Sequence, residues 1–366
     1  MNYLRQRPIP PTPMLSAYVF QVATPFSTGT GVYLPDYNLV VTNEHVVRDN
    51  ATVVIGSEAE GEQLAKVIYL DAYYDLAFLR PPTPFALPAL PLAETPLAVG
   101  DRILTMGQHF GHPLRTSEGV VLETDRQRHG IAFILHDAWQ EAAHSGGPVF
   151  TPEGELAGIN MYDLQEGRGR ALSLPVATVR ASLEGFAQGD GLEAARCFHC
   201  REVIFAVAVN PKGHCPHCGA EITLPNMVED YAPTGVAATV EDIITTAGHD
   251  ARLARRGPNL WSIRQGSAII QLAYHEDSGL VTGDAHLCAL PDFPDPDLFA
   301  FLLRENYELS QLSFSTYGND VILSLLIYDR YLTVETALPR FQHLFQKADG
   351  YDNVLVERYN AKWLVH

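Results

Sequence analysis

Four cysteines in two closely spaced pairs are the first residues whose spacing suggests chemistry. Cys197 and Cys200 are followed by Cys215 and Cys218, in the pattern C-x2-C-x14-C-x2-C. Two thiolates from each turn can surround one metal ion as a tetrahedron, and soft sulfur ligands favour zinc. A redox pair or a set of disulfides is the alternative use of this spacing. The pattern predicts a structural Zn2+ site with no open coordination position.

A second group of polar residues lies in the first half of the chain, in three separate blocks. These blocks are residues 28–47 (TGTGVYLPDYNLVVTNEHVV), 73–80 (YYDLAFLR) and 144–160 (HSGGPVFTPEGELAGIN). Hydrolysis of an amide needs a nucleophile, a base, a group that orients the base, and donors for the oxyanion. Candidates for all of these roles occur in this part of the chain.

The three blocks strongly resemble the motif blocks of chymotrypsin-fold serine proteases, and they are closest to the HtrA (Deg) branch. They follow the family's order of His, Asp and Ser. The resemblance implies that His45 is the general base, Asp75 its orienting acid and Ser145 the nucleophile. Asp71 is the nearest alternative acid, but it precedes the position that the family's D-L-A-x-L block uses. The resemblance also implies an all-β double barrel.

The loop before the nucleophile departs from the family pattern. Ala143 and His144 stand where the family usually has Gly followed by Asn or Asp. The resemblance makes the N–H groups of Ala143 and Ser145 the oxyanion donors. Because an alanine at positive φ costs about 1 to 2 kcal/mol, we expect one of two arrangements. Either the loop is strained and works, or it rests with the peptide flipped and waits for a partner.

The same resemblance suggests where the substrate is held. Trp139 aligns with the floor of the pocket for the side chain that precedes the cut, and RALSLPV aligns with the strand expected to pair with substrate backbone. From that strand, Ala171, Leu172 and Ser173 are the expected pocket residues. Trp139 supplies no negative charge, so we expect a preference for small or apolar side chains over Lys or Arg.

Length and local composition divide the chain into three predicted domains. A chain of 366 residues exceeds the size at which one core usually stops growing. Residues 1–190 contain many short strands broken by Gly, Pro, Asn and Asp, which predicts an all-β barrel or sandwich. Pro-rich residues 81–96 would join its two halves, and a helix from Val176 would close it. Residues 191–225 are the second predicted domain, with a strand-turn-strand between the cysteine pairs. The stretch Cys215-Pro216-His217-Cys218-Gly219 resembles the second cysteine turn of zinc ribbons, in which glycine allows a tight turn, so we expect a zinc ribbon here.

Residues 226–366 form the third predicted domain, in which helices and strands are mixed as in α+β folds. They resemble, more loosely, the YbjN family, whose fold is like that of type III secretion chaperones. The stretches that carry this resemblance are LLRENYEL, LVTGDAHLCALP and QKADGYDNVLVERY. It implies protein binding and no catalysis. Cys288 stands alone in an apolar strand, so we expect it in the core.

Charge and hydropathy bear on partners and location. The formal charge of −18 is distributed as −9, 0 and −9 over the three predicted domains. Nucleic acid is not expected as a partner because phosphate binding depends on clustered Lys and Arg. Apolar runs are too short to span a bilayer, and the N-terminal MNYLRQRPIPPTPM has prolines where a signal peptide needs its apolar region. We expect a cytoplasmic, bacterial protein without membrane contact.

Together these features predict a multidomain serine endopeptidase that acts on protein substrates. Its zinc ribbon and chaperone-like domain would recruit substrate or receive a signal from a protein activator or adaptor. The alternative is a pseudoprotease, an adaptor that binds proteins without cleaving them. Ala143 favours the adaptor, whereas the presence of His45, Asp75 and Ser145 favours the enzyme.

Overall fold

The computed structural model of the protein describes residues 12–364, except 58, 109–113, 163–168, 211 and 267. Most of the N-terminal stretch, residues 1–11, therefore lies outside the described residues. The chain forms two compact units, Met1–Asp230 and Tyr231–His366. The predicted ribbon lies within the first unit, and the division between the units falls close to the predicted boundary after residue 225.

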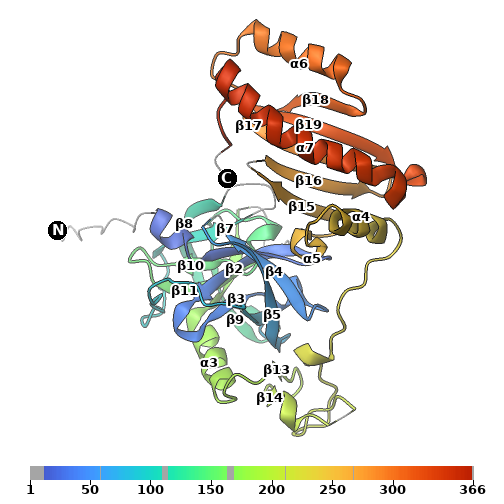
Figure 1. Cartoon of the computed structure of the whole chain (residues 1–366). Helices are drawn as coiled ribbons and strands as arrows, with labels where there is room; N and C mark the ends of the chain where they lie inside the picture. Colours follow the sequence, from blue (N-terminus) through green and yellow to red (C-terminus); the bar gives the residue numbers. More distant parts are fainter. Residues whose placement is uncertain are drawn as a thin grey trace, which may run out of the picture. The chain divides into compact units, whose positions relative to one another are not determined.

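The first half of the first unit is a closed six-stranded barrel (Figure 1). Its strands pair in the order β5-β4-β1-β2-β3-β6, and pairing of β5 with β6 closes it. Several of these strands are buried on both faces, as in β2 and β3, because apolar side chains pack inside the barrel and against its outer surface. The strands are β1 Val19–Ala23, β2 Thr28–Leu34, β3 Leu39–Thr42, β4 Thr52–Ser57, β5 Gly61–Asp71 and β6 Leu76–Arg80. The short helix α1, Thr12–Ser16, precedes them.

A second closed barrel follows, with strand order β10-β11-β12-β9-β8-β7. Residues 81–101 connect the two barrels, as the Pro-rich composition predicted, and helix α3, Val176–Ala187, follows the last strand. The trypsin-like double barrel is therefore confirmed. The strands are β7 Arg102–Gly107, β8 Arg115–Arg128, β9 Ile131–His136, β10 Pro148–Phe150, β11 Leu156–Met161 and β12 Ala171–Pro175.

The cysteine-bearing segment extends the first barrel. Strand β13, Ala194–Arg196, pairs in parallel with the end of β5, and β14, Val203–Phe205, pairs antiparallel with β13. After β14 the chain forms the 3-10 turn Ala206–Ala208. Only the first strand of the predicted strand-turn-strand is therefore present as expected. Val207 is 77% exposed, whereas Ala206 and Val209 pack against the core of the first barrel from the 3-10 turn and the residue after it.

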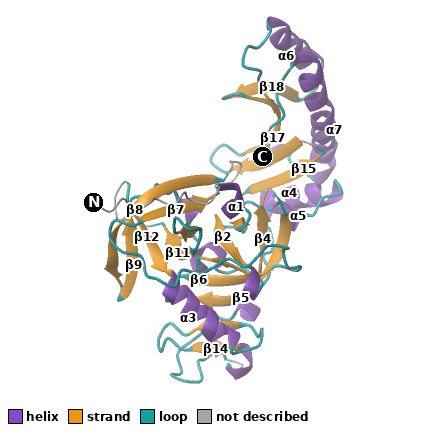
Figure 2. Ribbon diagram, turned by 90° about the vertical axis from the view of Figure 1, so that its left-hand side faces the viewer, coloured by secondary structure: helices purple, strands orange, loops and turns teal. Residues whose placement is uncertain are grey.

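The second unit is an antiparallel sheet in the order β15-β16-β17-β19-β18 with helices, as predicted. Figure 2 shows helix α7 running alongside these strands. Cys288 is fully buried, which confirms it as a core residue, and Asp295 caps α6 by accepting from Asp297 N–H. The strands are β15 Leu260–Gln265, β16 Ala268–His275, β17 Leu280–Ala289, β18 Leu312–Tyr317 and β19 Asp320–Tyr328. The helices are α4 Gly235–Thr246, α5 Ala251–Ala254, α6 Pro296–Glu308 and α7 Val334–Tyr359.

Among the described residues, no helix is both long enough and apolar enough to cross a membrane.

Candidate active site and cysteine cluster

His45 and Asp75 form a hydrogen-bonded pair in the first barrel. His45 lies in the one-turn helix α2, Glu44–Val47, which follows the end of β3. Asp75 lies in the turn between β5 and β6, at a φ of 54°. Its Oδ2 lies 2.7 Å from Nδ1 of His45, and its Oδ1 accepts from the backbone N–H of His45 at 2.9 Å. One carboxylate thus fixes both the ring and the backbone of the histidine.

The structure pairs His45 with Asp75 and gives Asp71 other partners. Asn43 Nδ2 donates to the carbonyl oxygen of Asp75 at 2.9 Å and helps to hold the acid in place. Asp71 is fully buried and accepts from Arg196 Nε at 2.6 Å. Residue types alone do not indicate the role of Asn43, whose only sequence signal is its position two residues before His45.

The environment of His45 favours its protonated form. Burial lowers the pKa of His45, but the hydrogen bond and charge of Asp75 outweigh it, so the pKa is raised above its usual 6.5. Glu44 adds to the rise and Arg48 opposes it. The imidazole side chain is 40% exposed. This is the arrangement that a general base oriented by a carboxylate requires.

Strand β2 brings Ser145 to the same region as His45. The N–H of Thr30 donates to the carbonyl oxygen of Ser145 at 2.8 Å. A Cβ atom built on Gly29 would lie 2.8 Å from a methyl group of Val46 and 3.0 Å from that carbonyl oxygen. The backbone of Ser145 and the neighbour of His45 therefore meet at one point on β2, where the two barrels join.

The two glycines after Ser145 are required by close packing. Gly146 has a φ of 83°, and a Cβ there would lie 2.2 Å from the carbonyl oxygen of Thr30 and 2.3 Å from Thr42 Oγ1. A Cβ on Gly147 would lie 2.3 Å from the carbonyl oxygen of Met106. The S-G-G sequence thus lets the loop fit between the strands of both barrels.

Of the two arrangements expected for the loop before Ser145, strained or at rest without strain at Ala143, the structure has the second. Ala143 lies in the 3-10 turn Ala142–His144 and does not have a positive φ. The N–H of Ser145 donates to Ala142 O at 3.1 Å, and Ser145 Oγ accepts from the N–H of Tyr162 at 3.3 Å. One predicted oxyanion donor is thus occupied. Among the contacts of the described residues, no hydrogen bond joins Ser145 Oγ to His45.

His144 anchors this loop onto strand β7. Its Nδ1 accepts from the N–H of Glu141 at 2.7 Å. A Cβ on Gly107 would lie 1.8 Å from His144 Cδ2, so only glycine leaves room for the imidazole. The ring of Trp139 meets that of His144 edge to face, with centroids 5.5 Å apart. The second departure from the family pattern is therefore accommodated by the neighbouring strand.

The expected pocket residues lie in two different environments. Trp139 is 44% exposed, and the guanidinium of Arg115 lies 5.2 Å from its ring centroid; its role as a pocket floor stays a prediction. Ala171, Leu172 and Ser173 lie in β12, which pairs with β11 on one side and β9 on the other. Leu172 and Ser173 are paired on both edges, whereas Ala171 is paired with β9; the role of these residues in substrate binding stays a prediction.

Comparison with known proteins identifies the double barrel. Residues 29–159 match the family described as "Trypsin-like peptidase domain". The double barrel is therefore similar to a trypsin-like peptidase domain over these residues. The matched segment includes His45, Asp75 and Ser145, and its curated relatives are serine proteases of the HtrA and DegP-like type.

Two relatives illustrate the extent of the similarity. Serine protease HTRA2, mitochondrial, of Bos taurus is 30% identical over 151 residues, which cover 39% of this chain and 33% of the relative. A probable periplasmic serine endoprotease, DegP-like, of Hahella chejuensis is 33% identical over 157 residues, which cover 41% of this chain and 33% of the relative. The chain thus spans about a third of the length of these relatives.

One solved structure is similar over about half of the chain. It is the crystal structure of Rv3671c from M. tuberculosis H37Rv, a serine-to-alanine mutant in an inactive form. The similarity covers 49% of this chain and 91% of that chain, with a TM-score of 0.44 and 20% sequence identity.

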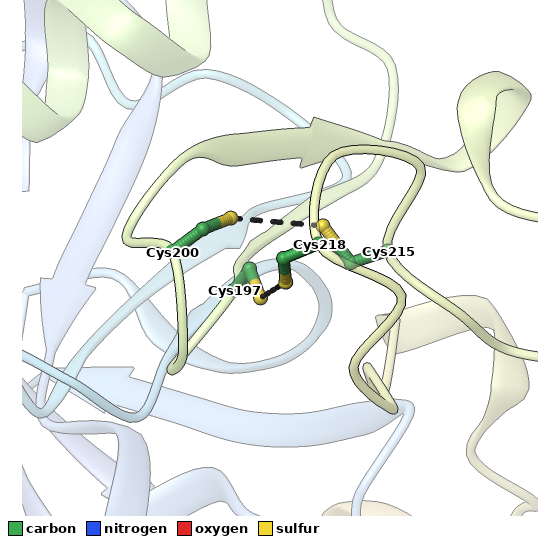
Figure 3. Close-up of side chains that lie close together, drawn as sticks. All are labelled: Cys197, Cys200, Cys215 and Cys218. Atoms are coloured by element: carbon green, nitrogen blue, oxygen red, sulfur yellow. Dashed lines mark hydrogen bonds between the residues drawn. The ribbon is translucent and has the colours of Figure 1, made fainter.

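Beyond the matched segment, the four cysteine side chains converge (Figure 3). Cys197 and Cys218 have their sulfurs 3.6 Å apart, and Cys200 and Cys215 have theirs 3.7 Å apart. All four sulfurs lie within 4.8 Å of one another. A tetrahedral ion with bonds of about 2.3 Å needs sulfurs about 3.8 Å apart, whereas a disulfide needs about 2.05 Å. The donor set fits a metal ion.

The two cysteine pairs form equivalent turns. Arg201 N–H donates to Cys197 O at 2.8 Å, and Gly219 N–H donates to Cys215 O at 2.9 Å. Both donors have positive φ, 67° for Arg201 and 75° for Gly219. The tight turn expected at Gly219 is confirmed, and the first pair achieves the same turn with an arginine.

Proposed function

We propose that this protein is a serine endopeptidase that uses His45, Asp75 and Ser145. Neutral His45 takes the proton of Ser145 Oγ while the hydroxyl oxygen attacks the carbonyl carbon of a peptide bond. Asp75 stabilises the resulting imidazolium, which then gives its proton to the leaving amine. The observation that carries the proposal is the His45–Asp75 pair, which is joined by two hydrogen bonds. It lies near Ser145 within the matched peptidase segment.

Activity requires a change in the loop around the nucleophile. In the resting loop the N–H of Ser145 donates to Ala142, so it does not stabilise an oxyanion. Loss of one oxyanion donor typically lowers kcat by about 10² to 10³. We therefore propose a regulated enzyme with low basal activity, in which a protein activator frees this donor.

Covalent labelling by a fluorophosphonate probe tests the enzyme against the adaptor. We expect the full chain to be labelled, and Ser145→Ala to abolish labelling. Ser278→Ala, which removes an exposed hydroxyl in the second unit, is the matched control and should label like the parent. If neither the parent nor the Ala143→Gly variant is labelled or cleaves peptides, the adaptor function is supported instead.

The four cysteines and the second unit complete the proposal. Cys197, Cys200, Cys215 and Cys218 would hold a structural Zn2+, whose role is to fold the segment that contains them. Residues 226–366 would bind a protein substrate or activator. A pull-down with full-length Ser145→Ala should retain a protein that the same variant truncated after residue 230 does not retain.

A further inference from the structure

The turn that carries Asp75 has a second carboxylate at its other end. Asp71 closes strand β5 and is fully buried. Its Oδ1 accepts from the N–H of Tyr74 at 3.0 Å, and its Oδ2 accepts from Tyr69 OH at 2.9 Å. The Asp71 side chain thus holds the backbone of the turn one residue before Asp75.

Arg196 links this carboxylate to the cysteine cluster. It ends strand β13 and directly precedes Cys197. Its Nε donates to Asp71 Oδ2 at 2.6 Å, and its Nη1 donates to the carbonyl oxygen of Arg201 at 2.6 Å. Nη2 donates to Ser182 Oγ on α3 at 3.2 Å. One guanidinium therefore joins the Asp75 turn, a helix and the first cysteine turn.

Side chains of the first cysteine turn also pack directly on the Asp75 turn. The ring of Phe198 meets that of Tyr73 edge to face, with centroids 5.9 Å apart. The guanidinium of Arg201 lies 4.6 Å from the Tyr73 ring centroid, and that of Arg196 lies 5.1 Å from the ring of Tyr74. Arg201 makes this contact from a backbone conformation in which the second cysteine turn has glycine.

We propose that Arg196 and Asp71 are positioning residues, through which the metal-bound cysteine cluster holds the turn that presents Asp75 to His45. The inference rests on the proposed peptidase function. It adds that the position of the catalytic acid, Asp75, depends on the cysteine cluster. Attachment of β13 to the barrel does not by itself require this pair, since Lys66 and Glu193 form an ion pair at the same junction. Attachment of β13 does not explain why Asp71 also accepts a hydrogen bond from the N–H of Tyr74, which lies inside the turn.

The first arm of the test uses kinetics of the full chain. Asp71→Asn keeps an acceptor for Tyr74 but loses the charge, and Arg196→Lys keeps the charge but loses the planar fork. Because misplacement of a catalytic group by about 1 Å can cost 10²-fold, we expect kcat to fall about 10- to 100-fold with KM little changed. Lys66→Gln, which removes the neighbouring ion pair, should leave kcat unchanged. If only KM changes in these two variants, or if neither kcat nor KM changes, the proposal is wrong.

The second arm does not depend on catalysis. In the Ser145→Ala variant, NMR titration of His45 reports its contact with Asp75. Glu44 and Arg48 also affect the pKa of His45, but they are the same in every variant compared. We expect Arg196→Lys, Arg196→Met and chelation of the metal each to move the His45 midpoint to lower pH, and Zn2+ to restore the chelated protein. Circular dichroism must show that the barrels remain folded. If Arg196→Met does not fold, the lysine variant and the chelated protein decide the result.

The two arms separate failure of this inference from failure of the proposed function. If the parent hydrolyses no peptide and takes no probe, the peptidase proposal fails, and the His45 titration still decides whether the cluster controls the Asp75 turn. If the parent is active but the His45 midpoint is the same in metal-bound and metal-free folded protein, the inference is wrong and the peptidase proposal stands.

Discussion

At Ser145, backbone geometry limits the chemistry more than residue type does. The hydroxyl oxygen accepts from Tyr162, and the N–H of Ser145 donates to Ala142. The second contact must break before the N–H can face an oxyanion, whereas a hydroxyl that accepts from Tyr162 can still donate to His45. The neighbouring Ala143 sets the cost of that change, because its side chain disfavours positive φ.

Replacing Ala143 by glycine should therefore activate the protein. Ala143→Gly removes a cost of about 1 to 2 kcal/mol for a left-handed residue, so we expect fluorophosphonate labelling about 5- to 30-fold faster at equal probe concentration. Ala142→Gly, a change one residue earlier in the same turn, is the matched control. Equal labelling rates in the parent and Ala143→Gly would contradict this account of the resting loop.

The His45–Asp75 pair predicts the acid limb of the pH profile. A general base must be neutral, and Asp75 raises the pKa of His45, so kcat/KM should rise with pH through a midpoint above 6.5. Asp75→Asn removes the charge that raises the pKa, so its midpoint should move down while kcat falls by up to about 10⁴. Stopped-time peptide assays between pH 5 and 9 measure both. A parent midpoint below 6.5 would contradict the assignment.

At the scale of elements, three strands of the second barrel share a buried polar chain. His136 Nε2 on β9 lies 2.8 Å from Ser173 Oγ on β12, which donates to Asn160 Oδ1 on β11 at 3.0 Å. The backbone of Asn160 exchanges hydrogen bonds with Gly146 and Gly147. This chain therefore supports the nucleophile loop from inside the barrel, and burial lowers the pKa of His136 to about 4.

This buried histidine predicts a pH-dependent stability. The folded protein keeps His136 neutral down to about pH 4, whereas the unfolded chain binds a proton below about 6.5. The free energy of unfolding should thus fall as pH drops from 6.5 to 4, by at most on the order of 3 kcal/mol. His136→Gln, which cannot titrate, should lose less stability over this range in urea unfolding. Parallel pH curves for the two proteins would refute the prediction.

The cysteine cluster predicts a metal requirement for the segment around β13 and β14. Cys215→Ser should lower the bound zinc, measured by elemental analysis, because it removes one of four converging sulfurs. It should also lower the melting temperature of the first unit, since folding of such a segment depends on its metal. Cys288→Ala is the control, because Cys288 lies in the second unit and should leave the zinc content unchanged.

At the scale of the whole molecule, the two units have separate cores. The core of the second unit consists of residues between Ala237 and Ala361, with Phe341, Leu344 and Leu355 of α7 packed among residues of the sheet. The clusters of the first unit contain residues from Leu15 to Leu224. Each unit thus buries its own apolar surface, which is the requirement for independent folding.

Residues 231–366 expressed alone should therefore fold cooperatively. Their apolar side chains are covered by their own sheet and helices, so we expect a single sigmoidal thermal transition and a well-dispersed NMR spectrum. The matched fragment is residues 1–230, which should fold in the presence of Zn2+. Loss of structure in the isolated second unit would show that it needs the first.

The sequence by itself determined most strands and helices, the order of His45, Asp75 and Ser145, and the pairing of cysteines in two turns, whereas the stretch around Ala206–Ala208 was wrongly expected to be extended. These properties depend on local spacing, because period-2 burial and C-x-x-C turns act over a few residues. Tertiary structure alone decided that Asp75 faces His45, that both edges of β12 are used, and that Arg196 holds Asp71. The last pair is separated by 125 residues, and only barrel closure and parallel pairing of β13 with β5 bring such distant groups into contact.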